Sequence, residues 1–250
     1  IIGIGQSYKH NWPQGLLHVE SSEGGVGGKP RPLLFLKPTS SYAFDRGSIE
    51  VPFGCRVYHE VELAIVIAKS GRDIPIQEAE DYIAGFALAL DMTAKNVQSH
   101  ARSEGLPWTT SKGLDTFTPI SDFIPRSKIL SSNPTSSSSS SSFALEELVL
   151  EFYLDSKLIQ RDSPSSLIYT LQELISYSSS IMTLEKGDVI LTGSPDKVGP
   201  VAVGQTVNAF LRRLPKLSDG ESPEGQVLAS LEMEVVDRVG GFRFDQGAKH

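Results

Sequence analysis

Hydrophobic positions along the chain fall mostly in short runs and alternating stretches, the pattern typical of β-strands. The predicted strands lie within residues 1–8, 33–38, 56–69, 86–94, 185–195 and 227–239, with a hairpin over 148–162 that turns near Asp155 and Ser156. Helical spacing predicts helices over 76–85, 94–105 and 171–184. Because strands outnumber helices and alternate with them irregularly, we expect a mixed, β-rich α+β fold in a single domain spanning residues 1–250.

The predicted strand 56–69, RVYHEVELAIVIAK, carries two acids in an otherwise apolar sequence. Residues two positions apart project from the same face of a strand, so Glu60 and Glu62 are expected to point the same way. One interpretation is an edge strand whose acidic face lies in water. The other is a covered strand whose two acids meet Asp91, at the end of the apolar strand 86–91, around a hard divalent cation such as Mg²⁺ or Mn²⁺.

Composition argues against several classes of function. The formal net charge is −7, so the chain lacks the basic footprint of a nucleic-acid-binding protein. No apolar run approaches the roughly 20 residues that span a bilayer, so no membrane is expected as a partner. Cys55 is the only cysteine; it excludes an intramolecular disulfide, favours a reducing compartment and is interpreted as a bystander. The serine-rich residues 131–142 predict a mobile surface insertion, with a domain linker as the alternative.

A set of motifs runs through most of the chain: GQSY, FLKP, HEVEL, LDMTAKNVQ, GLPWTTSKGLDTFTP and GDVILTGSPDKVGP. Together they resemble the fumarylacetoacetate hydrolase (FAH) superfamily, and within it the short, single-domain branch of acylpyruvases and oxaloacetate decarboxylases or tautomerases. The resemblance implies an FAH-type β-sandwich or β-roll with short peripheral helices. It maps the family's metal ligands onto Glu60, Glu62 and Asp91, with Mg²⁺ or Mn²⁺ as cofactor. It also implies a homodimer and a mitochondrial or cytoplasmic location.

Other matched positions are implied to contact the substrate. Lys112 is placed in the active site, where its ammonium group binds a substrate carboxylate or stabilises a developing enolate; a solvated surface lysine is the alternative. Lys95 stands where relatives carry Arg, so a bidentate carboxylate contact is expected to be lost there. Lys37 is assigned either to the substrate or to a structural ion pair. The remaining substrate-binding positions are Tyr8, Gln98 and Thr192.

Residues 9–32 are rich in glycine and follow the first strand, which predicts a mobile lid over the substrate. Relatives carry the pattern NYxxHxxE here, in which a histidine oriented by a glutamate activates water. In this chain the histidine is one residue closer to the tyrosine, and a proline occupies the glutamate position. Three interpretations stay open: His10 acts from its shifted position, His18 acts with Glu20 or Glu23, or the pair is absent.

The other histidines are assigned no chemistry. Alternation along the predicted strand turns His59 away from the two acids, so we expect it to pack in the interior. His100 and His250 are expected at the surface.

These features predict a metal-dependent enzyme that acts on small 2-oxo acids through a metal-bound enolate. Acylpyruvate hydrolysis and oxaloacetate decarboxylation both produce this enolate. The alternatives are keto–enol tautomerisation of oxaloacetate, an isomerase reaction, and hydrolysis of a fumarylpyruvate-type substrate. A metal-binding scaffold without turnover is a further alternative, and the presence of Lys112, Gln98 and the TGSP turn beside the acids favours the enzyme.

Overall fold

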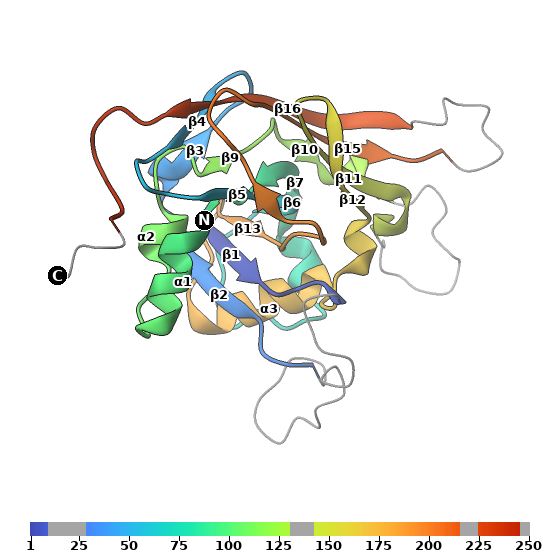
Figure 1. The fold of residues 1–250 in the computed structure, drawn as a ribbon. Helices are drawn as coiled ribbons and strands as arrows, with labels where there is room; N and C mark the ends of the chain where they lie inside the picture. Colours follow the sequence, from blue (N-terminus) through green and yellow to red (C-terminus); the bar gives the residue numbers. More distant parts are fainter. Residues whose placement is uncertain (10–28, 131–142, 216–224, 246–250) are drawn as a thin grey trace.

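The computed structural model describes residues 1–9, 29–130, 143–215 and 225–245. Its two largest sheets lie in layers, with the five-stranded sheet above the six-stranded sheet (Figure 1). The six-stranded sheet has the order β10 (Ile124–Pro125), β7 (Ile83–Leu90), β6 (Val61–Ile67), β13 (Val189–Leu191), β1 (Ile2–Gly5) and β2 (Leu33–Leu36). The five-stranded sheet has the order β12 (Lys157–Asp162), β11 (Leu148–Leu154), β15 (Thr206–Arg213), β16 (Gln226–Asp237) and β4 (Ser48–Val51).

Two smaller sheets complete the strand pairing of the described residues. The three-stranded sheet has the order β14 (Gly199–Pro200), β5 (Val57–His59) and β8 (Thr93–Ala94). The two-stranded sheet pairs β3 (Tyr42–Ala43) with β9 (Thr118–Pro119). Short 3₁₀ helices connect strands at Thr39–Ser41, Ala79–Tyr82, Arg126–Lys128, Leu145–Glu147 and Pro164–Ser166.

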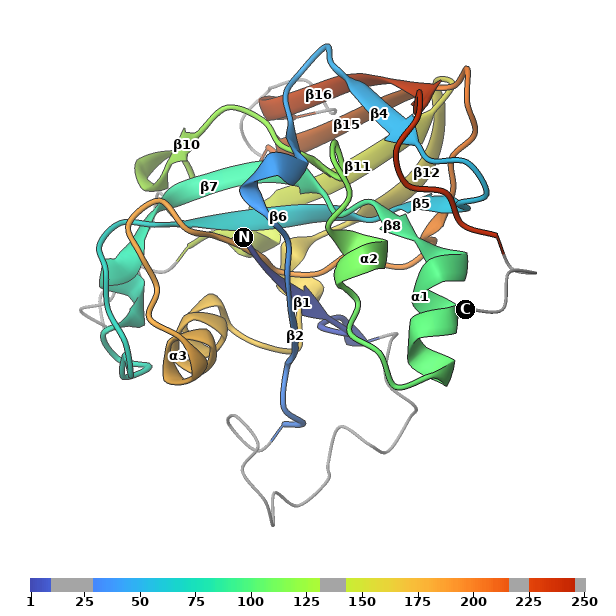
Figure 2. The ribbon, with the colours of Figure 1, turned by 90° about the vertical axis from the view of Figure 1, so that its left-hand side faces the viewer.

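The described helices are α1 (Lys95–Ser103), α2 (Thr109–Lys112) and α3 (Leu171–Ile181). Helix α1 follows β8 directly, and α1 and α2 lie beside the three-stranded sheet (Figure 2). Helix α3 begins at a capping box, in which the Glu173 N–H donates to Thr170 Oγ1 at 3.1 Å and the Thr170 N–H donates to Glu173 Oε2 at 2.7 Å. None of these helices is long and apolar enough to cross a membrane, among the residues described.

The main hydrophobic core lies between the two large sheets. Strand β11 packs against β6, and β16 packs against β7. Along β15 the buried residues alternate with partly exposed ones, because one face of the strand meets this core and the other faces outward. Leu63, Phe86 and Phe152 are among its fully buried side chains. This arrangement confirms the predicted β-rich α+β fold.

Most predicted strands are present, but two predicted elements are wrong. The segment 56–69 forms two strands, β5 and β6, which belong to different sheets. The segment 76–85 forms a turn and a 3₁₀ helix instead of an α-helix. The reason is that Ile83 already pairs with Ile67 of β6, and Gly85 pairs with Pro125 of β10, so the sheet takes the last part of the predicted helix. The predicted serine-rich insertion, 131–142, lies outside the described residues.

Candidate metal centre and active site

A bend in a pair of strands carries two of the three acids. Strands β6 and β7 pair in the six-stranded sheet, while β5 and β8 pair in the three-stranded sheet. Glu60 is the one residue between β5 and β6, and Asp91 follows the last residue of β7. The Asp91 N–H donates to the Glu60 carbonyl at 2.8 Å, which joins the two strands at the bend. The paired strands therefore change sheets at Glu60 and Asp91.

Carboxylate oxygens of Glu60, Glu62 and Asp91 all lie within 4.8 Å of one another. Glu62 and Asp91 are buried, and the side chain of Glu60 is 12% exposed. Glu62 Oε2 accepts a hydrogen bond of 2.6 Å from the Gly193 N–H, in the loop after β13. Gly193 has φ = +101°, and a Cβ there would lie 1.8 Å from Ser7 Oγ, so this approach requires glycine. The acids that the sequence grouped thus lie together, although they do not share one strand.

Three lysines neutralise this acidic cluster. Lys112 donates to Glu60 Oε2 at 2.9 Å and to Asp91 Oδ2. Lys95 donates to Glu60 Oε1 at 2.6 Å. Lys37 donates to Asp91 Oδ1 at 2.5 Å, and its side chain is fully buried. Both oxygens of Glu60 and both oxygens of Asp91 therefore accept hydrogen bonds from ammonium groups.

The pKa values of the two glutamates are displaced in opposite directions. Burial by itself raises the pKa of Glu60, but the charges of Lys112 and Lys95 outweigh burial and hold the pKa at about 2. Burial and the neighbouring charges of Asp91 and Glu60 raise the pKa of Glu62 well above its ordinary value of 4.5. Burial lowers the pKa of Lys112, yet Asp91 and Glu60 more than compensate and raise it above its ordinary value. These two carboxylates therefore favour the protonated form of Lys112.

A cavity of about 370 Å³ opens beside the cluster. Glu60 and Glu62 line it together with Lys112, the last residue of α2. One side of the cavity is aromatic, because the rings of Phe35 and Trp108 lie 5.9 Å apart there. The other described lining residues are Ile4, Gly5, Gln6, Tyr58, Lys95, Gln98, Arg102, Ser194 and Val198. The cavity thus joins an acidic, cation-binding end to an apolar wall.

The remaining predicted substrate positions divide into two groups. Lys95 and Gln98, both on α1, line the cavity. Tyr8, Lys37 and Thr192 are buried and are not among its described lining residues. The Thr192 hydroxyl donates to the Leu63 carbonyl at 2.8 Å, so it joins the loop after β13 to β6. Of the two roles left open for Lys37, the structure contains the ion pair.

The candidate histidine of the lid cannot be placed, because His10, His18, Glu20 and Glu23 lie outside the described residues. The described end of the predicted lid is anchored: Lys29 donates to Glu173 Oε2 at 2.7 Å. The lid therefore stays a prediction.

His59 is buried as predicted. It stacks on Phe152 with ring centroids 3.8 Å apart and lies 2.8 Å from Gln160 Oε1 through Nδ1. His100 is exposed, as predicted, and His250 lies outside the described residues. Burial raises the pKa of Cys55 to about 11, which fits an unreactive thiol.

Sequence reasoning did not detect Gln160, a fully buried residue of β12. Its Nε2 donates to the carbonyls of Pro195 and Asp196 at 3.0 and 2.9 Å. These bonds fix the amide so that Oε1 accepts from the Nδ1–H of His59. Gln160 thus ties the loop after β13, which contributes Ser194 to the cavity, to the three-stranded sheet. No local motif marks this role, since its partners are distant in sequence.

The fold and the three clustered acids are those of an FAH-type protein, and comparisons with known proteins agree. The fumarylacetoacetate (FAA) hydrolase C-terminal family matches residues 1–222, and the chain belongs to this family. It is 45% identical over 218 residues to a mitochondrial oxaloacetate tautomerase of Oryza sativa subsp. japonica, covering 86% of this chain and 85% of the relative. It is 46% identical over 185 residues to a mitochondrial oxaloacetate decarboxylase of Dictyostelium discoideum, covering 73% of this chain and 79% of the relative.

Solved structures show the same likeness. A yeast fumarylacetoacetate hydrolase family protein superposes with a TM-score of 0.77 at 30% identity, covering 98% of this chain and 96% of the other. A fumarylpyruvate hydrolase from Pseudomonas aeruginosa, in complex with Mn²⁺ and pyruvate, superposes with a TM-score of 0.69 at 26% identity, covering 95% and 89%. The family and the enzyme class predicted from the sequence are confirmed.

Proposed function

We propose that the chain is a divalent-cation-dependent enzyme that acts on oxaloacetate, by tautomerisation, decarboxylation or both. The observation that carries this proposal is the convergence of Glu60, Glu62 and Asp91 beside a cavity that also holds Lys112. The names of the relatives described above support oxaloacetate as the substrate. We extend the proposal to residues 1–250 as a single catalytic domain, to a mitochondrial location and to a homodimer.

The donor set fits a hard divalent cation. Carboxylate oxygens are the ligands that Mg²⁺ and Mn²⁺ prefer, and the spacing within 4.8 Å lets three of them contact one ion. The ammonium group of Lys112 already bridges Glu60 and Asp91, so this position favours positive charge. When bound, the cation supplies Lewis acidity that stabilises negative charge on the oxygen of an enolate. We propose Mg²⁺ or Mn²⁺ for this role.

The residues of the chain bind and orient the substrate. Lys112 carries an ammonium group at the cavity, and it stabilises a carboxylate or an enolate oxygen of the substrate by donating hydrogen bonds. The Gln98 amide offers a further polar contact at the cavity wall. Phe35 and Trp108 exclude water from that side, which strengthens the charge interactions. His10 or His18 of the predicted lid is proposed to move the proton or to activate water.

Hydrolysis of an acylpyruvate or fumarylpyruvate is the second candidate, and the likeness to the fumarylpyruvate hydrolase supports it. Hydrolysis requires an activated water, whereas decarboxylation and tautomerisation do not. Hydrolysis is therefore the reaction that depends most on the predicted lid.

One experiment separates these reactions. The purified chain is freed of metal with a chelator, supplied with Mg²⁺ or Mn²⁺, and assayed in parallel with enol-oxaloacetate, oxaloacetate and acetylpyruvate. We expect cation-dependent turnover of an oxaloacetate form, abolished by Glu62→Gln. Turnover of none of the three, together with no cation-dependent binding of the enolate mimic oxalate, contradicts the proposal and favours a scaffold. Light scattering on the same sample tests the homodimer.

A further inference from the structure

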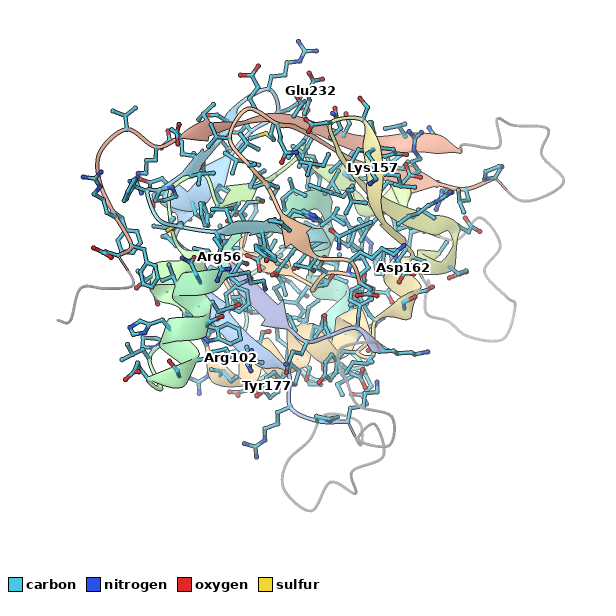
Figure 3. The ribbon with its side chains drawn as sticks, viewed as in Figure 1. Arg56, Arg102, Lys157, Asp162, Tyr177 and Glu232 are labelled. Atoms are coloured by element: carbon cyan, nitrogen blue, oxygen red, sulfur yellow. The ribbon has the colours of Figure 1, made fainter. Side chains whose placement is uncertain are left out.

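Helix α1 extends the cavity beyond the acidic cluster. Lys95, Gln98 and Arg102 of this helix all line the cavity. Their spacing of three and then four residues places them on one face of the helix, in successive turns. Figure 3 shows Arg102 at the lower end of α1, away from Arg56. Lys95, at one end of this face, contacts Glu60. The guanidinium group of Arg102 lies about two helical turns beyond Lys95.

Arg102 differs from the other cavity cations in having no carboxylate partner among the described residues. Lys95 and Lys112 both donate to Glu60, so their charges are already matched. Within the part of the chain that the structure describes, Arg102 makes no ion pair, and its residue is exposed. The ordinary explanation for a cation in the last turn of a helix is a favourable interaction with the helix dipole. That explanation does not require the side chain to line the cavity.

The direction of the side chain brings the guanidinium toward the cluster. Side chains on an α-helix lean toward its N-terminus, so Arg102 leans over Gln98, one turn closer to the acids. An arginine also presents a planar fork of donors that matches a carboxylate in a bidentate contact. The same helix face therefore presents a guanidinium group to the cavity beyond Lys95 and Gln98.

Charge balance indicates the ligand that this arrangement fits. Two carboxylates of the cluster, Glu60 and Asp91, pair with three lysine ammonium groups, and the third, Glu62, accepts from the Gly193 N–H. A bound divalent cation together with Arg102 leaves the cavity positively charged, which favours a dianion over a monoanion. A dianionic substrate presents its 2-oxo acid end to the cluster and its second carboxylate toward Arg102.

We propose that Arg102 binds the distal carboxylate of the substrate and makes the site selective for dicarboxylic 2-oxo acids over those that end in a neutral group. This inference rests on the proposed function. It assigns a specificity role to Arg102 and leaves the bond changes to the acidic cluster and Lys112.

The test compares two ligands that differ only in the distal group. Oxaloacetate carries a carboxylate where 2-oxobutyrate carries a methyl group. For Arg102→Gln we expect KM for oxaloacetate to rise about tenfold or more, the loss of one charge-assisted contact, with kcat little changed. The inhibition constant of 2-oxobutyrate is expected to change by less than about twofold. Arg102→Lys is expected to keep part of the discrimination, because it keeps the charge without the fork.

Arg56→Gln is the matched control, because Arg56 is an exposed arginine beside α1 that does not line this cavity. It is expected to change neither constant. Equal changes for both ligands in Arg102→Gln, or an unchanged KM for oxaloacetate, overturn the inference while leaving the proposed function intact. Absence of turnover in the wild-type protein rejects the proposed function, and the inference with it. A lower melting temperature of Arg102→Gln, with an unchanged ratio of KM for oxaloacetate to the inhibition constant of 2-oxobutyrate, assigns Arg102 to helix stability instead.

Discussion

Lys112 donates a hydrogen bond to Oδ2 of Asp91, on the carboxylate that also takes part in the proposed cation site. The other oxygen of Asp91 accepts from Lys37. A cation that binds Asp91 therefore shares this carboxylate with two ammonium groups that repel it. Lys37 is enclosed away from the cavity, whereas Lys112 lines it. Lys112 is thus the ammonium group whose charge competes most directly with a cation that enters from the cavity.

Lys112→Met is expected to separate binding of the cation from turnover. Removal of the competing ammonium group should tighten cation binding in the substrate-free protein by about threefold or more, or roughly 0.7 kcal/mol. Turnover should fall by roughly a hundredfold or more, because a charged donor to the substrate is lost. Calorimetric titration with Mn²⁺ and steady-state kinetics measure the two effects. Lys157→Met, at an exposed position on β12 shown in Figure 3, is the control; weaker cation binding in the Lys112 variant contradicts the competition.

Asp91→Ala is expected to destabilise the metal-free protein by about 3–5 kcal/mol, because it leaves the buried charge of Lys37 without its carboxylate partner. Burial already lowers the pKa of Lys37, which reflects the cost of keeping this charge inside. Urea unfolding in the presence of a chelator measures the change. Adding Lys37→Met to Asp91→Ala should restore part of the loss. Asp122→Ala, at an exposed position, is the control. If the free energy of unfolding changes equally little in Asp91→Ala and Asp122→Ala, the Lys37–Asp91 ion pair does not stabilise the fold.

The buried His59 predicts a specific pH dependence of stability. Burial lowers its pKa from the ordinary 6.5 to about 4, so the unfolded chain binds one more proton than the folded protein between these values. Stability should therefore fall as pH is lowered from 6.5 toward 4, by up to about 3 kcal/mol from this group, and should be unaffected by it above pH 6.5. Urea unfolding between pH 7 and 4.5 measures the slope. His59→Asn, which keeps a donor for Gln160, should flatten it; an identical slope assigns the proton to other groups.

Gln160→Leu should destabilise the protein by about 2–3 kcal/mol, because the buried His59 N–H loses its acceptor and two carbonyls lose their donor. The loop that contributes Ser194 to the cavity should also move, which should raise KM. Unfolding and kinetics measure the two effects. Gln226→Leu, at an exposed strand end, is the control. Equal stability of the two variants contradicts the positioning role.

The lid histidine stays a prediction, and two variants test it. We expect either His10→Ala or His18→Ala to lose hydrolysis of acetylpyruvate by tenfold or more, roughly 1.4 kcal/mol in barrier, while oxaloacetate chemistry suffers less. The two variants serve as controls for each other, since only one histidine is assigned to the water. Changes below about twofold in every reaction of both variants would remove the lid histidine from the mechanism.

Local patterns predicted most strands and the main acids. The hairpin over 148–162 turns at Asp155 and Ser156, which have φ values of 49° and 66°, as expected for a two-residue hairpin turn. Glu62 and Asp91 were found because a carboxylate at the end or inside of an apolar strand needs a partner. These signals lie within a few neighbouring residues, so the sequence contains them directly.

Signals that depend on distant partners were missed. The apolar alternation continues through Glu60, so nothing local shows that β5 and β6 pair in different sheets. The role of Gln160 depends on His59 and on the loop after β13, which are brought near only by the fold. Lys37 and Lys112 were assigned roles only through the family resemblance, because each reaches Asp91 from a separate element.

The bend at Glu60 and Asp91 has a consequence for the order in which the sheets fold and the cation binds. Because the two acids meet only where paired strands pass from one sheet into another, a chain with either sheet missing holds no complete cluster. Lysines pair with Glu60 and Asp91 once both sheets are formed, so we expect the chain to fold without metal. Cation binding during refolding should therefore appear only after the last sheet has assembled.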